Sequence, residues 1–191
     1  MGRKNATRCG CGAAHRNIRS VILRIPATGA EVCNSCMGRV AAVLDPKSNG
    51  GAAGAARKRP SIVLADDHPE LLDEIGRRLA TEFDVLRAVR EGSALVSAAS
   101  ELRPDIVISD VNMPNLTGIE ACRRILESGF SKNAILLTVY DEPELVRSAL
   151  EAGIRGYVLK VDAGEELVSS VRLVLSGQTY LSRRVLKNWT P

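Results

Sequence analysis

Five side chains with the potential for chemistry follow or end apolar stretches of the sequence. They are Asp66, Asp67, Asp110, Thr138 and Lys160, at the ends of the stretches 61–65, 105–109, 134–139 and 156–159. Three carboxylates held together repel one another, so such a cluster needs a cation. Oxygen ligands suit Mg²⁺, which takes one or two protein carboxylates together with phosphate oxygens. The cation and an ammonium group would offset the charge of a phosphoryl group moving to a carboxylate, and a hydroxyl can hydrogen-bond its oxygen.

The elements that position these side chains are predicted from periodicity. Strands are predicted over 61–65, 83–89, 105–109, 134–139 and 156–159, and helices over 69–80, 91–100, 117–128, 143–152 and 165–175. Near-continuous apolar strands between helices indicate a parallel sheet that is covered on both faces. We therefore expect an α/β domain with a doubly wound, five-stranded parallel sheet over residues 61–177. Ligands of such sheets gather at the carboxyl ends of the strands, where the five side chains lie.

Four segments of this region resemble the receiver domain of two-component response regulators. They are IVLADDHPE, DIVISDVNMPNLTGIE, ILLTVYDE and GYVLK, at the predicted first, third, fourth and fifth strands. Each segment is modest alone, but their order and spacing are highly specific. The resemblance implies a flavodoxin-like fold and a response regulator of a phosphorelay. In such a protein, Asp110 accepts a phosphoryl group from a histidine kinase or phosphotransfer protein.

The resemblance also implies a Mg²⁺ site at the phosphoacceptor. Asp67 ligates the ion directly and Asp66 acts through water, while Asp110 and the backbone carbonyl of Asn112 are further ligands. A domain of this kind is a phosphoacceptor rather than an enzyme, although it assists its own phosphorylation and dephosphorylation.

The switch that the resemblance implies involves three more residues. Thr138 and Lys160 contact the phosphoryl oxygens, and Tyr157 is the aromatic residue that reorients with Thr138. The surface around Tyr157 is where we expect a downstream protein or a second receiver to bind. Two other reactive side chains have structural interpretations: His68 as a surface residue and Cys122 as a small core side chain.

Four cysteines form two close pairs near the start of the chain. They are Cys9 with Cys11, and Cys33 with Cys36. In a reducing cytosol, paired cysteines indicate a metal site more often than disulfides, and four thiolates match tetrahedral Zn²⁺. The layout, with a strand predicted over 19–25, resembles a zinc ribbon, although C-x-C departs from the usual C-x-x-C. We expect a zinc-binding module over residues 1–44, with His15 as an alternative ligand, and a flexible Gly/Ala-rich linker over 45–60.

Charge is distributed unevenly along the chain. Residues 1–59 hold 11 Lys/Arg and 2 Asp/Glu, a net charge of +9, whereas residues 60–191 hold 15 and 20, a net charge of −5. The basic module could bind nucleic acid, which makes a transcriptional regulator the alternative function, or it could dock on a protein. Aromatic residues are only 3% of the chain, so stacking platforms for single-stranded nucleic acid are not expected.

The remaining expectations concern location and the end of the sequence. No apolar run approaches the ~20 residues of a membrane span, so we expect a cytoplasmic protein. Residues 178–191 are expected to form a C-terminal tail. The segment 175–182 resembles the junction to a helix-turn-helix domain, but nine residues after Ser182 cannot build one. A receiver without an output domain and a receiver that has lost its effector therefore both remain open.

Overall fold

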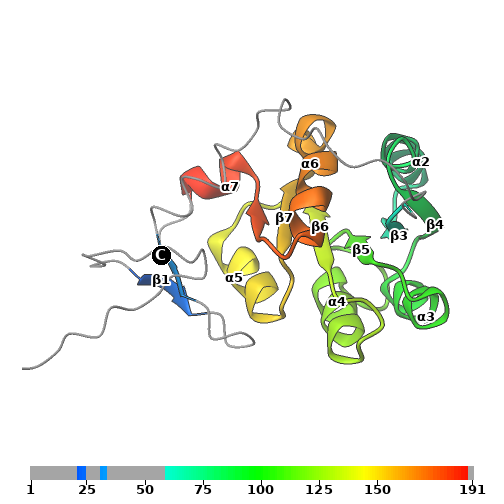
Figure 1. Cartoon of the computed structure of the whole chain (residues 1–191), viewed down its shortest axis with the longest axis horizontal. Helices are drawn as coiled ribbons and strands as arrows, with labels where there is room; N and C mark the ends of the chain where they lie inside the picture. Colours follow the sequence, from blue (N-terminus) through cyan, green and yellow to red (C-terminus); the bar gives the residue numbers. More distant parts are fainter. Residues whose placement is uncertain (1–20, 25–30, 34–58, 189–191) are drawn as a thin grey trace, which may run out of the picture. The chain divides into compact units, whose positions relative to one another are not determined.

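The computed structural model describes residues 21–24, 31–33 and 59–188 (Figure 1). The chain divides into two units, one of residues 1–55 and 190–191 and one of residues 56–189, and each is described by itself. In the first unit, strand β1 (Val21–Arg24) pairs antiparallel with β2 (Glu31–Cys33). β1 lies within the strand predicted over 19–25. Of the predicted zinc ligands, Cys9, Cys11 and Cys36 lie outside the described residues, and Cys33 is described only as the last residue of β2.

The second unit is a sheet of six parallel strands with helices between them. The strands are β3 (Ser61–Ala65), β4 (Asp84–Val89), β5 (Ile106–Ser109), β6 (Ala134–Thr138), β7 (Gly156–Leu159) and β8 (Tyr180–Leu181), in the order β4-β3-β5-β6-β7-β8. The helices are α2 (Pro69–Leu79), α3 (Gly92–Leu102), α4 (Gly118–Glu127), α5 (Pro143–Glu151), α6 (Ala163–Leu175) and α7 (Arg183–Asn188), with a short 3₁₀ helix η1 (Lys160–Asp162). The prediction of a doubly wound, flavodoxin-like α/β fold is confirmed.

Helices cover both faces of this sheet. Figure 1 shows α2 and α6 on one side and α3, α4 and α5 on the other. Every residue of β3, β5, β6 and β7 is buried, because these strands are enclosed on both faces. Alternate apolar residues of the central strands form one cluster with Leu72 and Ile75 of α2 and Leu167 and Val171 of α6. Within the described residues, no helix is long and apolar enough to cross a membrane.

Local sequence signals fix the ends of several helices. Thr117 caps α4, and its side-chain oxygen accepts a hydrogen bond from the amide of Glu120. Gly129 follows α4 with a φ of 66°, the left-handed conformation that glycine adopts at low cost. Pro69 and Pro143 occupy the first turns of α2 and α5, where a missing amide hydrogen costs nothing. These ends lie as the sequence predicts, within one or two residues.

The sheet has one strand more than the five that were predicted. β8 pairs in parallel with β7, in the register Gly156↔Tyr180 and Tyr157↔Leu181. It lies in the segment that was expected to be a C-terminal tail, and the fold continues into α7, whose Val185 is buried. A strand of two residues is too short to show periodicity, so it could not be predicted from the sequence. The folded unit therefore extends past Gly177.

Candidate functional site

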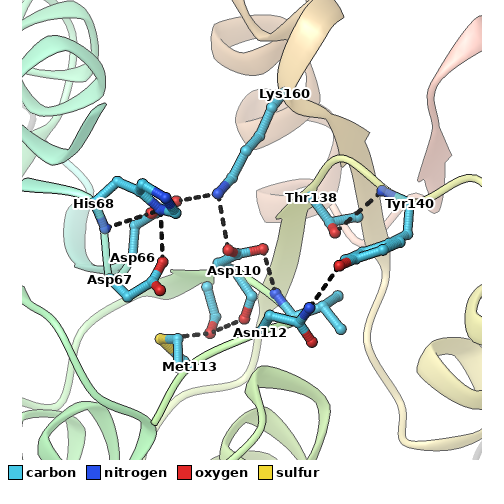
Figure 2. Close-up of polar contacts among 11 residues, drawn as sticks. Asp66, Asp67, His68, Asp110, Asn112, Met113, Thr138, Tyr140 and Lys160 are labelled. Carbon is cyan, nitrogen blue, oxygen red and sulfur yellow. Dashed lines mark hydrogen bonds and ion pairs between the residues drawn. The ribbon is translucent and has the colours of Figure 1, made fainter. Parts of the chain in front are cut away.

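The carboxyl ends of three strands bring a lysine and two aspartates together (Figure 2). Asp66 follows β3, Asp110 follows β5 and Lys160 follows β7. The Nζ atom of Lys160 lies 2.7 Å from Oδ2 of Asp66 and 2.8 Å from Oδ2 of Asp110. Side chains from opposite halves of the sheet thus meet in one ion-pair cluster, at the rim where the sequence places them.

The electrostatics of this cluster follow from its burial. Asp66 is 1% exposed and Asp110 is 5% exposed. Burial raises the pKa of Asp110, the charge of Asp66 raises it further, and the hydrogen bond from Lys160 offsets only part of this. Burial lowers the pKa of Lys160, but its hydrogen bonds to Asp110 and Asp66 outweigh this, and its pKa lies above the ordinary value. Lys160 is therefore a firm cation between two buried carboxylates.

The loop after β5 orients the carboxylate of Asp110. The amide of Val111 donates a hydrogen bond of 2.6 Å to Oδ1, which leaves Oδ2 to face Lys160. The backbone amide of Asp110 donates to the carbonyl of Ala65 (2.8 Å), and its own carbonyl accepts from the hydroxyl of Ser109 (2.9 Å). Gly118 lies against this carbonyl, and a Cβ at that position would overlap the oxygen. The close approach of α4 thus fixes the backbone of Asp110.

Asp67 and His68 form the more exposed part of the acidic rim. Nδ1 of His68 lies 2.7 Å from Oδ1 of Asp67 and 3.2 Å from Oδ1 of Asp66. The side chain of His68 is 69% exposed, as expected of a surface residue, but it contacts both carboxylates. These contacts were not predicted, because adjacency in the chain was their only signal.

The donor set of this rim fits a hard divalent cation. Asp66, Asp67 and His68 each place a potential ligand atom within 4.8 Å of the others. Asp110 joins them through its shared contact with Lys160. Oxygen donors predominate, which suits Mg²⁺, and one ammonium cannot neutralise three carboxylates. The chemistry of these residues is therefore that of a cation site.

Thr138 and Tyr157 lie beside the cluster and are connected through Tyr140. The hydroxyl of Tyr157 donates to the carbonyl of Tyr140 (2.9 Å), and the amide of Tyr140 donates to Oγ1 of Thr138 (3.4 Å). The side-chain amide of Asn112 donates to the hydroxyl of Tyr140 (2.7 Å), as Figure 2 shows. Tyr157 is 1% exposed, and burial raises its pKa, so it stays a neutral donor. Sequence reasoning did not single out Tyr140, because its role depends on the loop that carries it.

Comparison with known proteins agrees with this geometry. Residues 62–172 match the family of the response regulator receiver domain. The response regulator GacA of Pseudomonas viridiflava is 35% identical over 138 residues, which cover 68% of this chain and 64% of GacA. The response regulator UvrY of Escherichia coli K12 is 36% identical over 125 residues, which cover 64% of this chain and 57% of UvrY. The chain thus spans less than two thirds of the length of these curated relatives.

Solved structures give the same result. A two-component response regulator of the LuxR family from Aurantimonas sp. SI85-9A1 is 30% identical, with a TM-score of 0.62 over 67% of this chain and 93% of that one. The signal receiver domain of the putative response regulator NarL from Mycobacterium tuberculosis is 25% identical, with a TM-score of 0.60 over 63% of this chain and 99% of that domain. This chain belongs to the response regulator receiver family and carries a receiver domain of two-component signal transduction. Receiver domains use Mg²⁺ at their acidic site, and Asp66 and Asp67 belong to a group of side chains that could hold a metal ion.

Proposed function

We propose that the chain is a phosphorelay response regulator that accepts a phosphoryl group on Asp110 from a histidine kinase or phosphotransfer protein. The observation that carries the proposal is the buried Asp110, held by Val111 through one oxygen and paired with Lys160 through the other. It lies beside a second buried carboxylate, Asp66, in a fold of the receiver family. A structural aspartate at a strand end has no need of a shared lysine from another strand.

The proposed reaction needs only groups that this rim supplies. A carboxylate oxygen of Asp110 attacks the phosphorus of a phosphohistidine, and the new P–O bond forms as the P–N bond breaks. The leaving imidazole takes up a proton. Lys160 lies 2.8 Å from Oδ2 of Asp110, so its charge is positioned to stabilise the transferred oxygens, and Thr138 supplies a hydroxyl from the next strand. The protein acts here as a phosphoacceptor that assists its own phosphorylation and dephosphorylation, not as an enzyme with separate substrates.

Mg²⁺ would be held by Asp67 directly, by Asp66 through water, and by Asp110 and the backbone carbonyl of Asn112. Contacts of Asp66 support this division, because its Oδ2 pairs with Lys160 and its Oδ1 accepts from the amide of His68 (3.0 Å). Asp67 is more exposed, with 38% of its side chain accessible. The bound ion supplies positive charge for the phosphoryl oxygens.

Phosphorylation in vitro tests the proposal. With Mg²⁺ and acetyl phosphate, the chain should gain one phosphoryl group, detected by intact mass. Asp110→Asn should remain unlabelled, because an amide is a far poorer nucleophile. The matched control is Asp73→Asn, a substitution of the same kind at an exposed position of α2, which should label like the wild type. Undiminished labelling of Asp110→Asn would sink the assignment.

The output of phosphorylation is proposed to be a change of surface. A phosphoryl group adds a charge of roughly −1.5 to −2 at pH 7, and it acts at a distance only by biasing a two-state element. Thr138 and Tyr157 would form that element, with Tyr157 filling the space that Thr138 vacates. The surface of α5 around Arg147, Leu150 and Glu151 would then bind a downstream protein or a second receiver.

A second candidate function is transcriptional regulation through the basic amino-terminal module. One relative, 30% identical over 129 residues, is the transcriptional regulatory protein DegU of Brevibacillus brevis, and residues 1–59 carry a net charge of +9.

One Zn²⁺ would be held in this module by four cysteines, Cys9, Cys11, Cys33 and Cys36. Metal analysis should find about one zinc per chain, lost in Cys33→Ser. DNA affinity that falls steeply with salt would support nucleic-acid binding, and affinity independent of salt would exclude it.

A further inference from the structure

Residues that follow the last long helix return to β7, the strand that directly precedes Lys160. The amide of Tyr180 donates to the carbonyl of Arg155 (2.8 Å), and the amide of Ser182 donates to the carbonyl of Tyr157 (2.9 Å). These bonds place β8 along the outer edge of β7, whose polar groups would otherwise lie on an open sheet edge. The segment 180–182 is therefore paired with the strand that ends at the site.

The side chain of Ser182 reaches the last residue of that strand. Its Oγ accepts a hydrogen bond of 3.0 Å from the amide of Leu159 and donates one of 2.7 Å to Oε2 of Glu166. Ser182 is fully buried and Glu166 is 6% exposed. A buried hydroxyl with both of its bonds made has a fixed orientation, and leaving a buried donor unpaired is costly. The Leu159 amide is thus held by Ser182, and Ser182 by Glu166.

Leu159 immediately precedes Lys160, at the point where the strand turns into η1. On its other side, Leu159 lies in register with Thr138 of β6. The chain after Ser182 is also anchored past Lys160, since Nε of Arg184 lies 3.1 Å from Oδ1 of Asp162. Contacts to this segment therefore flank Lys160 on both sides in the sequence.

The position of Lys160 has little tolerance. Its Nζ must reach Oδ2 of both Asp66 and Asp110 at once, at 2.7 and 2.8 Å. A long side chain that must contact two partners depends on the orientation of the backbone from which it extends. Hydrogen bonds of the neighbouring backbone groups help to set that orientation. The Leu159 amide, which Ser182 holds, belongs to the residue directly before Lys160.

We propose that Ser182, oriented by Glu166, is a positioning residue for Lys160, so that the phosphoryl chemistry of Asp110 depends on the segment after the last long helix. This inference rests on the proposed role of Asp110. Ser182 touches neither Asp110 nor a phosphoryl group, and it acts through the Leu159–Lys160 backbone.

A beryllofluoride titration of the full chain with saturating Mg²⁺ tests the inference, since beryllofluoride mimics a phosphoryl group. Ser182→Ala should weaken its affinity by about tenfold, the equilibrium equivalent of one or two hydrogen bonds. Ser170→Ala is the matched control. Ser170 is also fully buried, but its hydroxyl bonds Leu167 of its own helix (2.7 Å), so its loss should change affinity less than about twofold.

A double-mutant cycle separates positioning from mere packing. In a Lys160→Ala background, Ser182→Ala should have no further effect, because an absent ammonium cannot be misplaced. A structural role would weaken affinity by the same factor in both backgrounds, and that result would overturn the proposal. An equal effect of Ser182→Ala and Ser170→Ala would also overturn it.

Failure of the underlying function gives a different pattern. If the wild type does not bind beryllofluoride, or if Lys160→Ala binds it as tightly as the wild type, the phosphoacceptor site is wrong and the positioning role falls with it. If Ser182→Ala does not fold, the wild-type protein still gives a test. Beryllofluoride should shift the amide resonance of Leu159 and slow its hydrogen exchange, because Lys160 is then held by a third partner. An unmoved Leu159 amide contradicts the coupling.

Discussion

The acidic rim and the β7–β8 edge both bury carboxylates, and they balance them in different ways. At the rim, Asp66 and Asp110 share one ammonium, Lys160, so negative charge remains in excess. At the edge, Glu166 accepts a hydrogen bond from the Ser182 hydroxyl, and Arg183 lies 3.8 Å away. Uncompensated negative charge at the rim is costly to bury and favours the binding of a further cation. A buried carboxylate that already accepts hydrogen bonds needs no such partner. The rim therefore has the charge of a binding site, whereas the contacts at the β7–β8 edge are structural.

The largest expected effect comes from the backbone that supports the rim. Gly118→Ala would drive a Cβ into the carbonyl oxygen of Asp110, so the loop or α4 must move. We expect a loss of about 3 kcal/mol in the free energy of unfolding, the cost of overpacking against rigid backbone. Urea denaturation measures it.

Gly76→Ala is the control for this substitution. Gly76 lies inside α2 with no atom within 4 Å of a new Cβ, so alanine should stabilise the helix by roughly 0.5–1 kcal/mol. Equal and small effects at both positions would show that the rim does not depend on close packing of α4.

The second prediction concerns the cation. Asp67→Ala should weaken Mg²⁺ binding about thirtyfold, and Asp66→Ala less, since loss of a direct ligand costs more than loss of a water-mediated one. Calorimetric titration with Mg²⁺ measures both. Equal losses would contradict the division of roles, and no loss in either variant would remove the cation from the rim.

The contrast between the two regions also explains which parts were predictable. Each rim residue follows an apolar stretch that is closed on both faces, so Asp66, Asp110 and Lys160 stand out as charged residues directly after apolar runs. Thr117 and Gly129 mark helix ends by their own conformational preferences. Such signals are local, and they sufficed for most of the fold.

The edge lacks local signals of this kind. Tyr180 and Leu181 are both buried, so no alternation marks a strand, and their pairing exists only because β7 offers a free edge. Ser182 matters because folding brings it to Leu159, 23 residues earlier, and to Glu166, 16 residues earlier. Tyr140 gains its role in the same way, from contacts with Asn112 and Tyr157. Long-range contacts of single side chains leave no pattern in the sequence.

The third prediction concerns the free-energy cost of burying the ionised carboxylate of Asp110. The pKa of Asp110 is raised mainly by burial, so its ionised form costs free energy on folding. This cost is absent below the ordinary pKa of the carboxyl group and present at neutral pH. Asp110→Asn should therefore raise the melting temperature at pH 7 without Mg²⁺, by a few degrees. A lower melting temperature would show that the ion pair with Lys160 outweighs burial.

The smallest effect is expected at the edge, from Tyr180→Phe. The pKa of Tyr180 is raised, first by burial and then by its hydrogen bond to Glu166. Loss of this hydroxyl should cost only about 1 kcal/mol in the free energy of unfolding at pH 8, because Glu166 keeps its bond from Ser182.

The pH dependence of this effect follows from the raised pKa of Tyr180. In the wild type, the fold favours the neutral tyrosine, so the contribution of Tyr180 to the free energy of unfolding is complete below a pH of about 10 and is lost as the pH rises further. The deficit of Tyr180→Phe should therefore narrow between pH 8 and pH 11 in urea denaturation. Burial also raises the pKa values of Tyr157 and Cys122. Their ionisation in the same pH range lowers the free energy of unfolding of the wild type and of Tyr180→Phe by the same amount. A deficit that is the same at both pH values would mean that Tyr180 does not titrate as a buried donor to Glu166, and that the edge is less firmly bonded than the rim it supports.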